Sequence, residues 1–362
     1  MRLIFLIRHA EPVFPGGVRR CCLGRRTDTP LTENGRHQAS DYGAAFDFIP
    51  AENFFASRLR RAAETAEILL NGRGRAKLLP GVEELDCGEW EGLGFDEISR
   101  RFPEIYEARH NDMSIPPPGG ESFDSAADRG IKAIMCALSE TKGDIAVAAH
   151  AGVNRAIMCR CLGLPMRDNR TLDQQYACVN VLGEENGRLK VLCVGRLASD
   201  FPDDDEIMAL YERHKTPENV RQHCRAVSEK AEELISRLPG GGGGGRLRAA
   251  ALLHDLCRTE RNHAYEAAGC LRENGYPVIA EMIERHHDLG YTGAFGDREL
   301  LYLADKLVSG TQSVTISERF ARSAEKCRSP EAIAAHERRK AETEKIYDEY
   351  LRLCGAENGG QP

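Results

Sequence analysis

The chain has 362 residues, a length typical of two domains, and its 41% hydrophobic and 29% charged content is ordinary for globular proteins. A net charge of -7 and the lack of a membrane-length apolar run argue against a nucleic-acid polymer or a membrane as partner. The 13 cysteines are scattered without metal-ligand spacing, and the opening apolar run is too short for a secretory signal. We therefore expect reduced cysteines and a cytoplasmic protein.

The first part of the chain alternates apolar, strand-like runs with helical patterns. The apolar runs are Leu3–Ile7, Asn53–Ala56, Ile145–Ala149, Val179–Leu182 and Lys190–Val194. Alternation of this kind predicts an α/β domain over residues 1–198, with a mostly parallel sheet flanked by helices.

The second part of the chain carries long helical patterns and no strand signal. An acidic stretch with a proline, residues 199–206, predicts a linker, and residues 207–354 predict an all-α domain. Helices are expected over Pro217–Leu238, Arg246–Cys257, His263–Asn274, Pro277–His287 and Pro330–Leu353. The six glycines Gly240–Gly245 predict a flexible loop, and residues 355–362 predict a disordered tail.

The first apolar run stops on Arg8-His9, where open α/β sheets place ligand chemistry. Three further polar residues lie at the boundaries of predicted elements. Arg61 begins a helical pattern, Glu84 precedes a glycine turn, and His150 ends a second apolar run. Guanidinium groups suit phosphate oxygens, and helix starts attract anions, so these residue types predict a phosphate pocket.

These motifs, in this order, resemble those of the histidine phosphatase (phosphoglycerate mutase-like) superfamily. The matching segments are Arg8-His9-Ala10-Glu11, Pro30-Leu-Thr-Glu-Asn-Gly35, Ser57 to Ala66, Glu84 to Gly92 and His150-Ala-Gly152. The resemblance implies a phosphoglycerate mutase-like α/β sandwich and a phosphohistidine formed on His9, with no cofactor.

The same resemblance implies a role for each polar residue of the pocket. Arg8, Arg61 and His150 would bind the phosphoryl oxygens, and Glu11 would contribute to substrate binding. Glu84 would protonate the leaving oxygen and later deprotonate water. Arginines beside His9 favour its neutral, nucleophilic form.

One departure from the mutases concerns the loop after Glu11. The sequence there is Pro12-Val-Phe-Pro-Gly-Gly17, where phosphoglycerate mutases carry a Trp-Asn pair. The stretches Arg19–Gly24 and Asp28–Leu31 are more similar to the phosphatase branch, including α-ribazole phosphatase-like members. We therefore favour a phosphatase, with a phosphoglycerate-type mutase as the alternative.

Imidazoles and carboxylates gather in the helical part of the chain. These residues are His223, His254, Asp255, His263, His286 and Asp305. Together they suit a divalent ion such as Fe, Mn, Co or Ni. The other histidines are interpreted differently: His287 is expected to face away from His286, and His110 and His214 are expected at the surface.

This second pattern resembles the HD-domain metal-dependent phosphohydrolases. The resemblance implies that the six residues bind one or two ions (Fe, Mn, Co, Ni or Mg) that assist hydrolysis of a phosphoester. A one-metal site built from His223, His254, Asp255 and Asp305 remains open. Lys306 and Arg258 are candidates for substrate phosphate, although surface ion pairing explains them equally well, and Arg319 is interpreted as part of a solvated helix face.

Taken together, the two resemblances predict a bifunctional phosphohydrolase that acts on a small phosphorylated metabolite or nucleotide. The alternative is that one domain binds a nucleotide without turning it over. The oligomeric state is left open by the sequence.

Overall fold

The computed structural model describes residues 1–17, 21–239, 244–325 and 327–355, and the chain divides into two compact units at Ala198 and Ser199. Most of the predicted glycine loop (240–243) and the predicted tail (356–362) lie outside the described residues. No helix in the described ranges has both the length and the apolarity needed to cross a bilayer.

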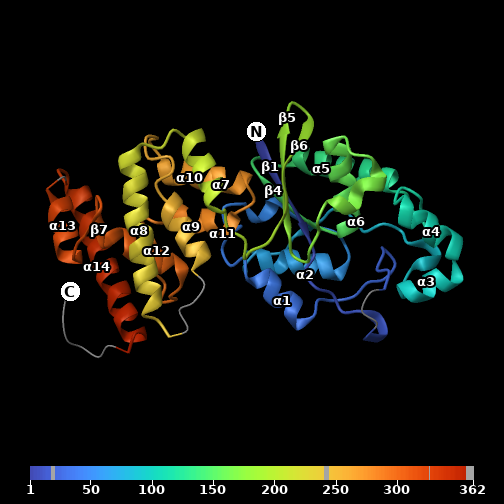
Figure 1. Ribbon diagram of the computed structural model, residues 1–362, viewed down its shortest axis with the longest axis horizontal. Coiled ribbons are helices and arrows are strands. Elements are labelled where there is room, and N and C mark those ends of the chain that lie inside the picture. The colour runs from blue at the N-terminus through green and yellow to red at the C-terminus, as the bar shows by residue number, and fades with distance from the viewer. Residues whose placement is uncertain (18–20, 240–243, 326, 356–362) are drawn as a thin grey trace. The chain divides into compact units, whose positions relative to one another are not determined.

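The first unit contains a six-stranded sheet in the order β3-β2-β4-β1-β5-β6 (Figure 1). Its strands are β1 (Arg2–Arg8), β2 (Phe54–Ala56), β3 (Lys77–Leu78), β4 (Ile145–Ala149), β5 (Val179–Glu185) and β6 (Arg188–Arg196). Strands β3, β2, β4 and β1 are parallel, whereas β5 and β6 are antiparallel additions at one edge. The predicted mostly parallel sheet is confirmed, and the short, exposed β3 is an addition that its sequence did not predict.

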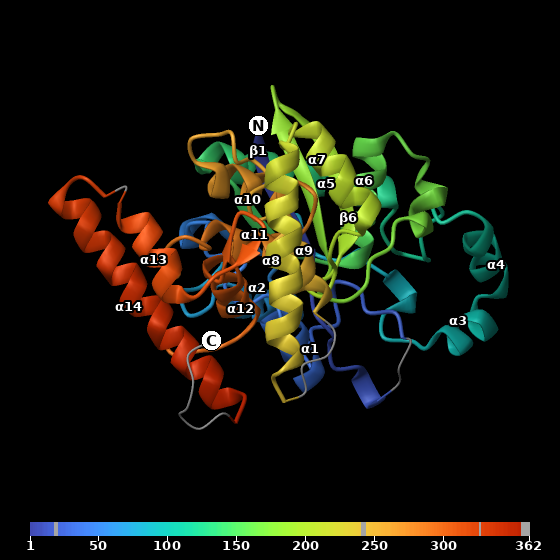
Figure 2. The same ribbon diagram turned by 60° about the vertical axis from the view of Figure 1, so that its left-hand side comes forward.

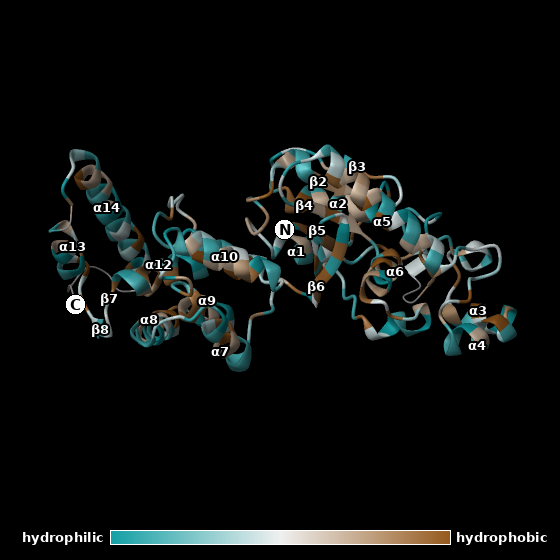
Figure 3. Cartoon of the chain, turned by 90° about the horizontal axis from the view of Figure 1, so that it is seen from above, coloured by the Kyte–Doolittle hydropathy of each residue, from teal (hydrophilic) through white to brown (hydrophobic). Residues whose placement is uncertain are grey.

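The α-helices in the described part of the first unit are α1 (Glu33–Ser40), α2 (Arg60–Leu69), α3 (Phe95–Arg101), α4 (Pro103–Asn111), α5 (Phe123–Glu140) and α6 (Ala151–Leu162). Helix α2 packs on β2 and β4, α6 packs on β1 and β6, and α3 packs on α4. Alternate residues of β1 serve opposite faces: Ile4 and Leu6 join the core with α5 and α6, while Phe5 packs edge-on against Phe46. The central strands accordingly carry hydrophobic colours in Figure 3.

The second unit is built from helices, with one small hairpin. The helices are α7 (Asp204–Arg213), α8 (Glu218–Ser236), α9 (Gly245–Leu253), α10 (His263–Glu273), α11 (Pro277–Glu284), α12 (Asp297–Lys306), α13 (Ile316–Ala324) and α14 (Pro330–Leu353). Helices α8, α9 and α12 pack against one another and share the core, and α13 lies beside α14 (Figures 1 and 2).

Three details of the helical unit differ from the predictions. The hairpin of β7 (Val308–Ser309) and β8 (Gln312–Ser313) breaks the expected strand-free pattern. Helix α7 begins within the predicted linker, because Asp203 and Glu206 form a capping box at its start. Helices α9 and α11 end before the histidines that were predicted to lie within them, so these histidines lie in turns.

Candidate active site and metal centre

The first site lies at the carboxyl ends of the two central parallel strands. Strands β1 and β4 pair in register, with Arg8 opposite Ala149, so the next residues, His9 and His150, emerge side by side. The His9 amide donates to the Ala149 carbonyl at 2.9 Å, and the two imidazole centroids are 5.1 Å apart. Both side chains are buried.

The surroundings of His9 hold one of its ring nitrogens ready as a nucleophile. Its Nδ1 lies 2.8 Å from the carbonyl oxygen of Ala10, which can only accept, so Nδ1 carries the proton. Nε2 therefore keeps its lone pair. Burial, followed by the charges of Arg61 and Arg8, holds the pKa of His9 well below its usual value, which keeps the ring neutral.

Two arginines complete the cationic part of this pocket. Arg61 lies in the first turn of α2, fully buried, and donates to the carbonyls of Thr27 at 2.7 Å and Gly24 at 3.1 Å. Arg8 donates to the carbonyl of Gln174. Burial lowers the pKa of Arg61, although a guanidinium remains charged at neutral pH.

Several buried polar atoms of this pocket have no hydrogen-bond partner among the described residues. They are Nε of Arg8, Nε of Arg61 and both ring nitrogens of His150. Leaving such groups unpaired costs about 1–3 kcal/mol each. Burial, followed by the charges of Arg61, His9 and Arg8, also holds the pKa of His150 well below its usual value. A phosphate dianion would accept hydrogen bonds from the N–H donors among these groups, so the pocket suits a phosphoryl ligand.

Glu84 is held beside His150 by the start of α6. One carboxylate oxygen accepts from the Gly152 amide at 3.1 Å, and the other accepts from the amides of Val153 at 3.1 Å and Leu85 at 3.0 Å. A Cβ atom at position 152 would lie 2.5 Å from Glu84 Oε1, so only glycine leaves room for this contact. The structure thus brings Glu84 to the same edge of the sheet as the imidazoles.

Glu11 anchors the segment that follows His9. Its carboxylate accepts from the Asn34 side chain at 2.6 Å, and its carbonyl accepts from the Thr32 amide at 2.9 Å. These contacts join the segment after His9 to the start of α1. The predicted contribution of Glu11 to substrate binding stays a prediction.

Tyr176 belongs to the pocket, although no sequence motif selects it. Its ring lies 3.9 Å from the Arg8 guanidinium carbon and its centroid is 5.8 Å from that of His9. The next residue, Ala177, has a positive φ of 59°, an uncommon conformation for alanine, and its amide donates to the His9 carbonyl at 3.2 Å. A tyrosine so far along the chain from Arg8 carries no local motif, and only the fold reveals the contact.

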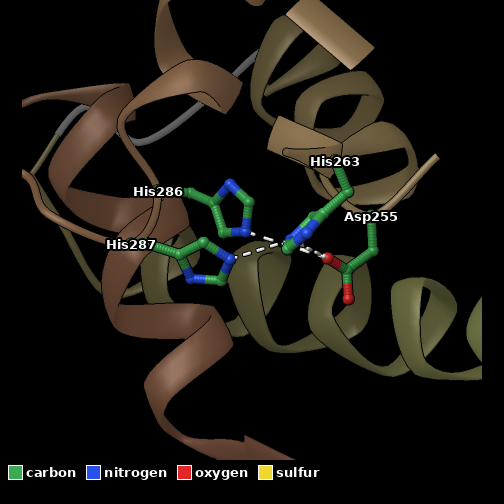
Figure 4. Close-up of side chains that lie close together, drawn as sticks. All are labelled: Asp255, His263, His286 and His287. Carbon is green, nitrogen blue, oxygen red and sulfur yellow. Dashed lines mark hydrogen bonds and ion pairs between the residues drawn. The ribbon is translucent and has the colours of Figure 1, made fainter. Parts of the chain in front are cut away.

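The second site is a group of imidazoles and carboxylates in the helical unit (Figure 4). His263 Nε2 lies 3.2 Å from Asp255 Oδ1 and 2.8 Å from His287 Nε2, and His286 Nε2 lies 3.8 Å from Asp255 Oδ1. The expectation that His287 faces away from His286 is wrong, because their ring centroids are 3.9 Å apart. Both residues follow the end of α11, where helical side-chain spacing no longer applies.

His223 and Asp305 extend this group to a second set of donors. His223 Nε2 lies 3.4 Å from Asp305 Oδ1, and His254 Nε2 lies 3.7 Å from Asp255 and 3.8 Å from Asp305. All six predicted metal-binding residues therefore lie in one cluster. Asp255 is close enough to share ions with two subsets, one with His263, His286 and His287 and the other with His223 and His254.

The backbone orients three of these imidazoles. The Nδ1 atoms of His223, His254 and His286 lie 2.8, 2.8 and 2.6 Å from the carbonyl oxygens of Gly310, Ala251 and Ile283. Each Nδ1 must donate, which directs the Nε2 atoms at the cluster. Nε2 of His254 and of His286 is buried and has no hydrogen bond among the described residues. Imidazoles beside carboxylates suit one or two divalent ions.

The two histidines that were expected at the surface differ in how far they are buried. His110 is exposed, as expected. His214 is half-buried, with its ring nitrogens 3.2 Å from the Cys270 sulfur and 3.4 Å from the Cys257 sulfur, so its expected surface position is wrong. Helix α7 packs on α9, which carries His214 into the helical core.

The fold and the two sites define a phosphoryl-handling enzyme, with an arginine-lined pocket in an α/β unit and a cluster of possible metal ligands in a helical unit. The chain belongs to the histidine phosphatase superfamily (branch 1), which matches residues 4–196. Residues 220–337 match the HD domain. Both predicted resemblances are thereby confirmed, and the protein is a phosphatase.

Two relatives with curated names agree with this assignment. Adenosylcobalamin/alpha-ribazole phosphatase of Escherichia coli (strain K12) is 30% identical over 174 residues, which cover 46% of this chain and 81% of that protein. Metal-independent phosphoserine phosphatase of Arabidopsis thaliana is 32% identical over 167 residues, 43% of this chain and 67% of that protein. Among solved structures, Bacillus stearothermophilus YhfR has a TM-score of 0.48 at 26% identity, over 52% of this chain and 94% of that chain.

Proposed function

We propose that this protein is a bifunctional phosphohydrolase, in which a metal-free phosphomonoesterase and a metal-dependent phosphoester hydrolase share one chain. The observation that carries the proposal is that each unit has its own buried, unpartnered ring nitrogens. In the first unit they belong to His150 beside two arginines, and in the second to His254 and His286 beside two carboxylates. The two environments suit opposite ligands, an anion and a cation.

In the first unit, the reaction would begin on the free nitrogen of His9. Nε2 attacks phosphorus as the bond to the leaving oxygen breaks, while the guanidinium groups of Arg8 and Arg61 and the His150 ring hold the phosphoryl oxygens. Glu84 donates a proton to the leaving oxygen. In the second step Glu84 takes a proton from the water that attacks the phosphohistidine, and phosphate is released.

In the second unit, the residues proposed to hold the ion or ions are His223, His254, Asp255, His263, His286 and Asp305, and the geometry adds His287. A bound divalent ion would supply Lewis-acid stabilisation of charge that develops on a phosphoryl group. The backbone carbonyls that receive the Nδ1 protons fix the tautomers of His223, His254 and His286 in advance.

For substrates, we propose nucleotides or a nucleotide-like metabolite. The support comes from the adenosylcobalamin/alpha-ribazole phosphatase relative, and from the absence in the Pro12–Gly17 loop of the Trp-Asn pair of mutases. Two activities on one chain suggest related substrates. A sensor role for one unit and a mutase role for the first unit are the alternatives.

The test is a set of assays on the full chain and two variants. His9→Ala and Asp255→Ala are compared with wild type on α-ribazole phosphate, phosphoserine, a nucleotide panel and a generic diester, with and without Mn²⁺. We expect His9→Ala to lose metal-independent monoesterase activity alone and Asp255→Ala to lose metal-dependent activity alone. Full retention of metal-dependent activity in Asp255→Ala contradicts the second half of the proposal, and phosphoryl transfer within one substrate would identify a mutase.

A further inference from the structure

A proline- and glycine-rich loop, residues 116–120, packs against the segment that carries Glu84. At the end of this loop, the Glu121 amide donates to the Asp86 carbonyl at 2.8 Å. A Cβ atom at Gly120 would lie 2.6 Å from the same carbonyl oxygen, so glycine permits this close approach. The loop therefore places Glu121 beside the Glu84 segment, although the two are far apart in the sequence.

The Glu121 carboxylate binds two arginines from different parts of the first unit. Its Oε1 accepts from Arg129 Nε at 2.7 Å, and its Oε2 accepts from Arg129 Nη2 at 2.9 Å and from Arg25 Nη2 at 2.5 Å. Its side chain is only 11% exposed. Burial raises the pKa of Glu121, but the hydrogen bond and charge of Arg129 and the charge of Arg25 outweigh burial and hold this pKa below its usual value. Glu121 is thus an ionised group shared between two cations.

Both arginines also bind the backbone of the Glu84 segment. Arg25 Nε and Arg129 Nη2 each donate to the Glu84 carbonyl at 3.3 Å. Arg129 Nη1 donates to the Gly81 carbonyl at 2.7 Å, and the Arg25 amide donates to the Leu85 carbonyl at 3.1 Å. The backbone at Glu84 is therefore fixed by ion-paired arginines, whereas its carboxylate is held by the amides at the start of α6.

The negative charge of Glu121 is needed for this network. Its Oε2 accepts from both arginines and also from the Asp86 amide at 3.4 Å. In glutamine one carboxylate oxygen becomes an NH₂ group, which would face N–H donors instead of accepting from them. Arg129 keeps another carboxylate nearby, because Glu83 Oε2 lies 4.0 Å from its Nη1. Loss of the Glu121 charge should thus loosen the network without leaving Arg129 unpaired.

We propose that Glu121 is a positioning residue of the monoesterase, which fixes the backbone at Glu84 through the two arginines. This inference rests on the proposed acid–base role of Glu84. Proton transfer requires the carboxylate to lie within hydrogen-bond reach of the leaving oxygen, so a shift of the Glu84 backbone weakens this step. Among the described residues, no hydrogen bond links Glu121 to Arg8 or Arg61, so phosphate binding should be preserved.

The experiment compares two kinds of monoester with the full chain, in EDTA so that metal-dependent activity is silent. Phosphoserine and α-ribazole phosphate are alkyl esters, whose leaving oxygen needs a proton, whereas nitrophenolate leaves p-nitrophenyl phosphate without one. We expect Glu121→Gln to lower kcat/KM for the alkyl esters by on the order of 10²-fold, the lower range for a general acid. For p-nitrophenyl phosphate the loss should be about threefold or less, because no proton is needed. The inhibition constant of inorganic phosphate should not change.

Three further variants sharpen the comparison. Glu84→Gln should show the same preferential loss on alkyl esters, and adding Glu121→Gln to it should lower their kcat/KM no further. Asp124→Asn is the matched control, because Asp124 also pairs with an arginine, Arg160 at 2.9 Å, but its side chain is 61% exposed. This control should match wild type on both esters. Glu121→Asp, which keeps the charge on a shorter side chain, should retain part of the alkyl activity and provides the comparison if Glu121→Gln does not fold.

The possible failures point to different errors. Equal losses on both kinds of ester, or no loss, in a folded Glu121 variant overturn the positioning role, as does a further loss on alkyl esters in the double variant. If Glu84→Gln itself shows no preferential loss on alkyl esters, the proposed acid–base role of Glu84 fails instead.

Discussion

The two units build their sites from different parts of their secondary structure. In the α/β unit, the pairing of β1 with β4 places His9 and His150 together before any side-chain contact is considered. In the helical unit, α9 and α11 end before the site residues, and the turns that follow these helices position Asp255, His286 and His287. A strand register thus positions the first site, whereas helix termination positions the second.

This difference has a chemical counterpart. The first pocket lowers the pKa of two imidazoles by burial and by arginines, and so favours neutral imidazoles beside an anion. The second orients imidazole lone pairs through backbone carbonyls toward carboxylates, an arrangement that favours a cation. The sites should therefore respond independently to mutation and to chelation.

Among the changes that should affect one site and not the other, His9→Ala is expected to have the largest effect on activity. Loss of the nucleophile should lower metal-independent monoesterase kcat by on the order of 10⁴-fold or more. Acid-labile labelling of the protein by a ³²P-monoester should disappear as well. The metal-dependent activity should remain within about twofold of wild type, since burial keeps His9 within the first unit; a parallel loss of both activities would show that the units are coupled.

Removal of metal by a chelator should affect the second site and leave the first site unchanged. EDTA should abolish the metal-dependent activity and leave the monoesterase unchanged. A ligand at about 100 times its Kd stabilises a fold by about 2.7 kcal/mol, so metal removal should lower the melting temperature of the helical unit, followed by far-UV circular dichroism. Trp90 is the only tryptophan and is buried in the first unit, so its fluorescence transition should not move. A shift of the tryptophan transition on chelation would contradict the independence of the units.

Gly152→Ala tests the contact between Glu84 and α6. The added methyl would meet Glu84 Oε1 at 2.5 Å and displace the carboxylate from the helix start. Monoesterase kcat should fall by about 10²-fold, the lower range for a general acid. Gly269→Ala in α10, where nothing lies within 4 Å of the new atom, is the matched control. Equal activity of the two variants would remove Glu84 from the proposed role.

The pairing of His9 with His150 was predictable, because each follows an apolar run typical of a strand and the ends of parallel strands meet at one edge of a sheet. Arg61 and Glu84 were given their roles only by the family resemblance. The contact of Glu11 with Asn34 was not predictable, because a motif position does not reveal which side chain binds a carboxylate. His287 was misplaced for another reason: a helical spacing was assumed where α11 had already ended. Contacts between residues distant in sequence, such as Arg8 with Tyr176, have no local signal at all.

The low pKa values of the paired imidazoles predict that the stability of the first unit depends on pH. Below pH 6.5 the unfolded chain protonates His9 and His150 while the folded chain does not, so unfolding becomes easier as the pH falls. Each histidine should remove up to about 1.4 kcal/mol per pH unit until its folded pKa is reached. Urea unfolding followed by Trp90 fluorescence at pH 7.5 and 5.5 measures this slope. The double variant His9→Gln, His150→Gln should flatten it, and an unchanged slope would assign the effect elsewhere.

The smallest expected effect concerns the aromatic contact of Arg8 in the first pocket. Tyr176 covers the Arg8 guanidinium at 3.9 Å, an interaction worth roughly 0.5–2 kcal/mol. Tyr176→Ala should free Arg8 and raise the KM for a monoester about three- to tenfold, whereas Tyr176→Phe, which keeps the ring, should remain near wild type. The metal-dependent activity should not respond to either variant. If Phe and Ala variants lose affinity equally, the hydroxyl and not the ring is the important group, and Tyr176 would act on substrate directly instead of positioning Arg8.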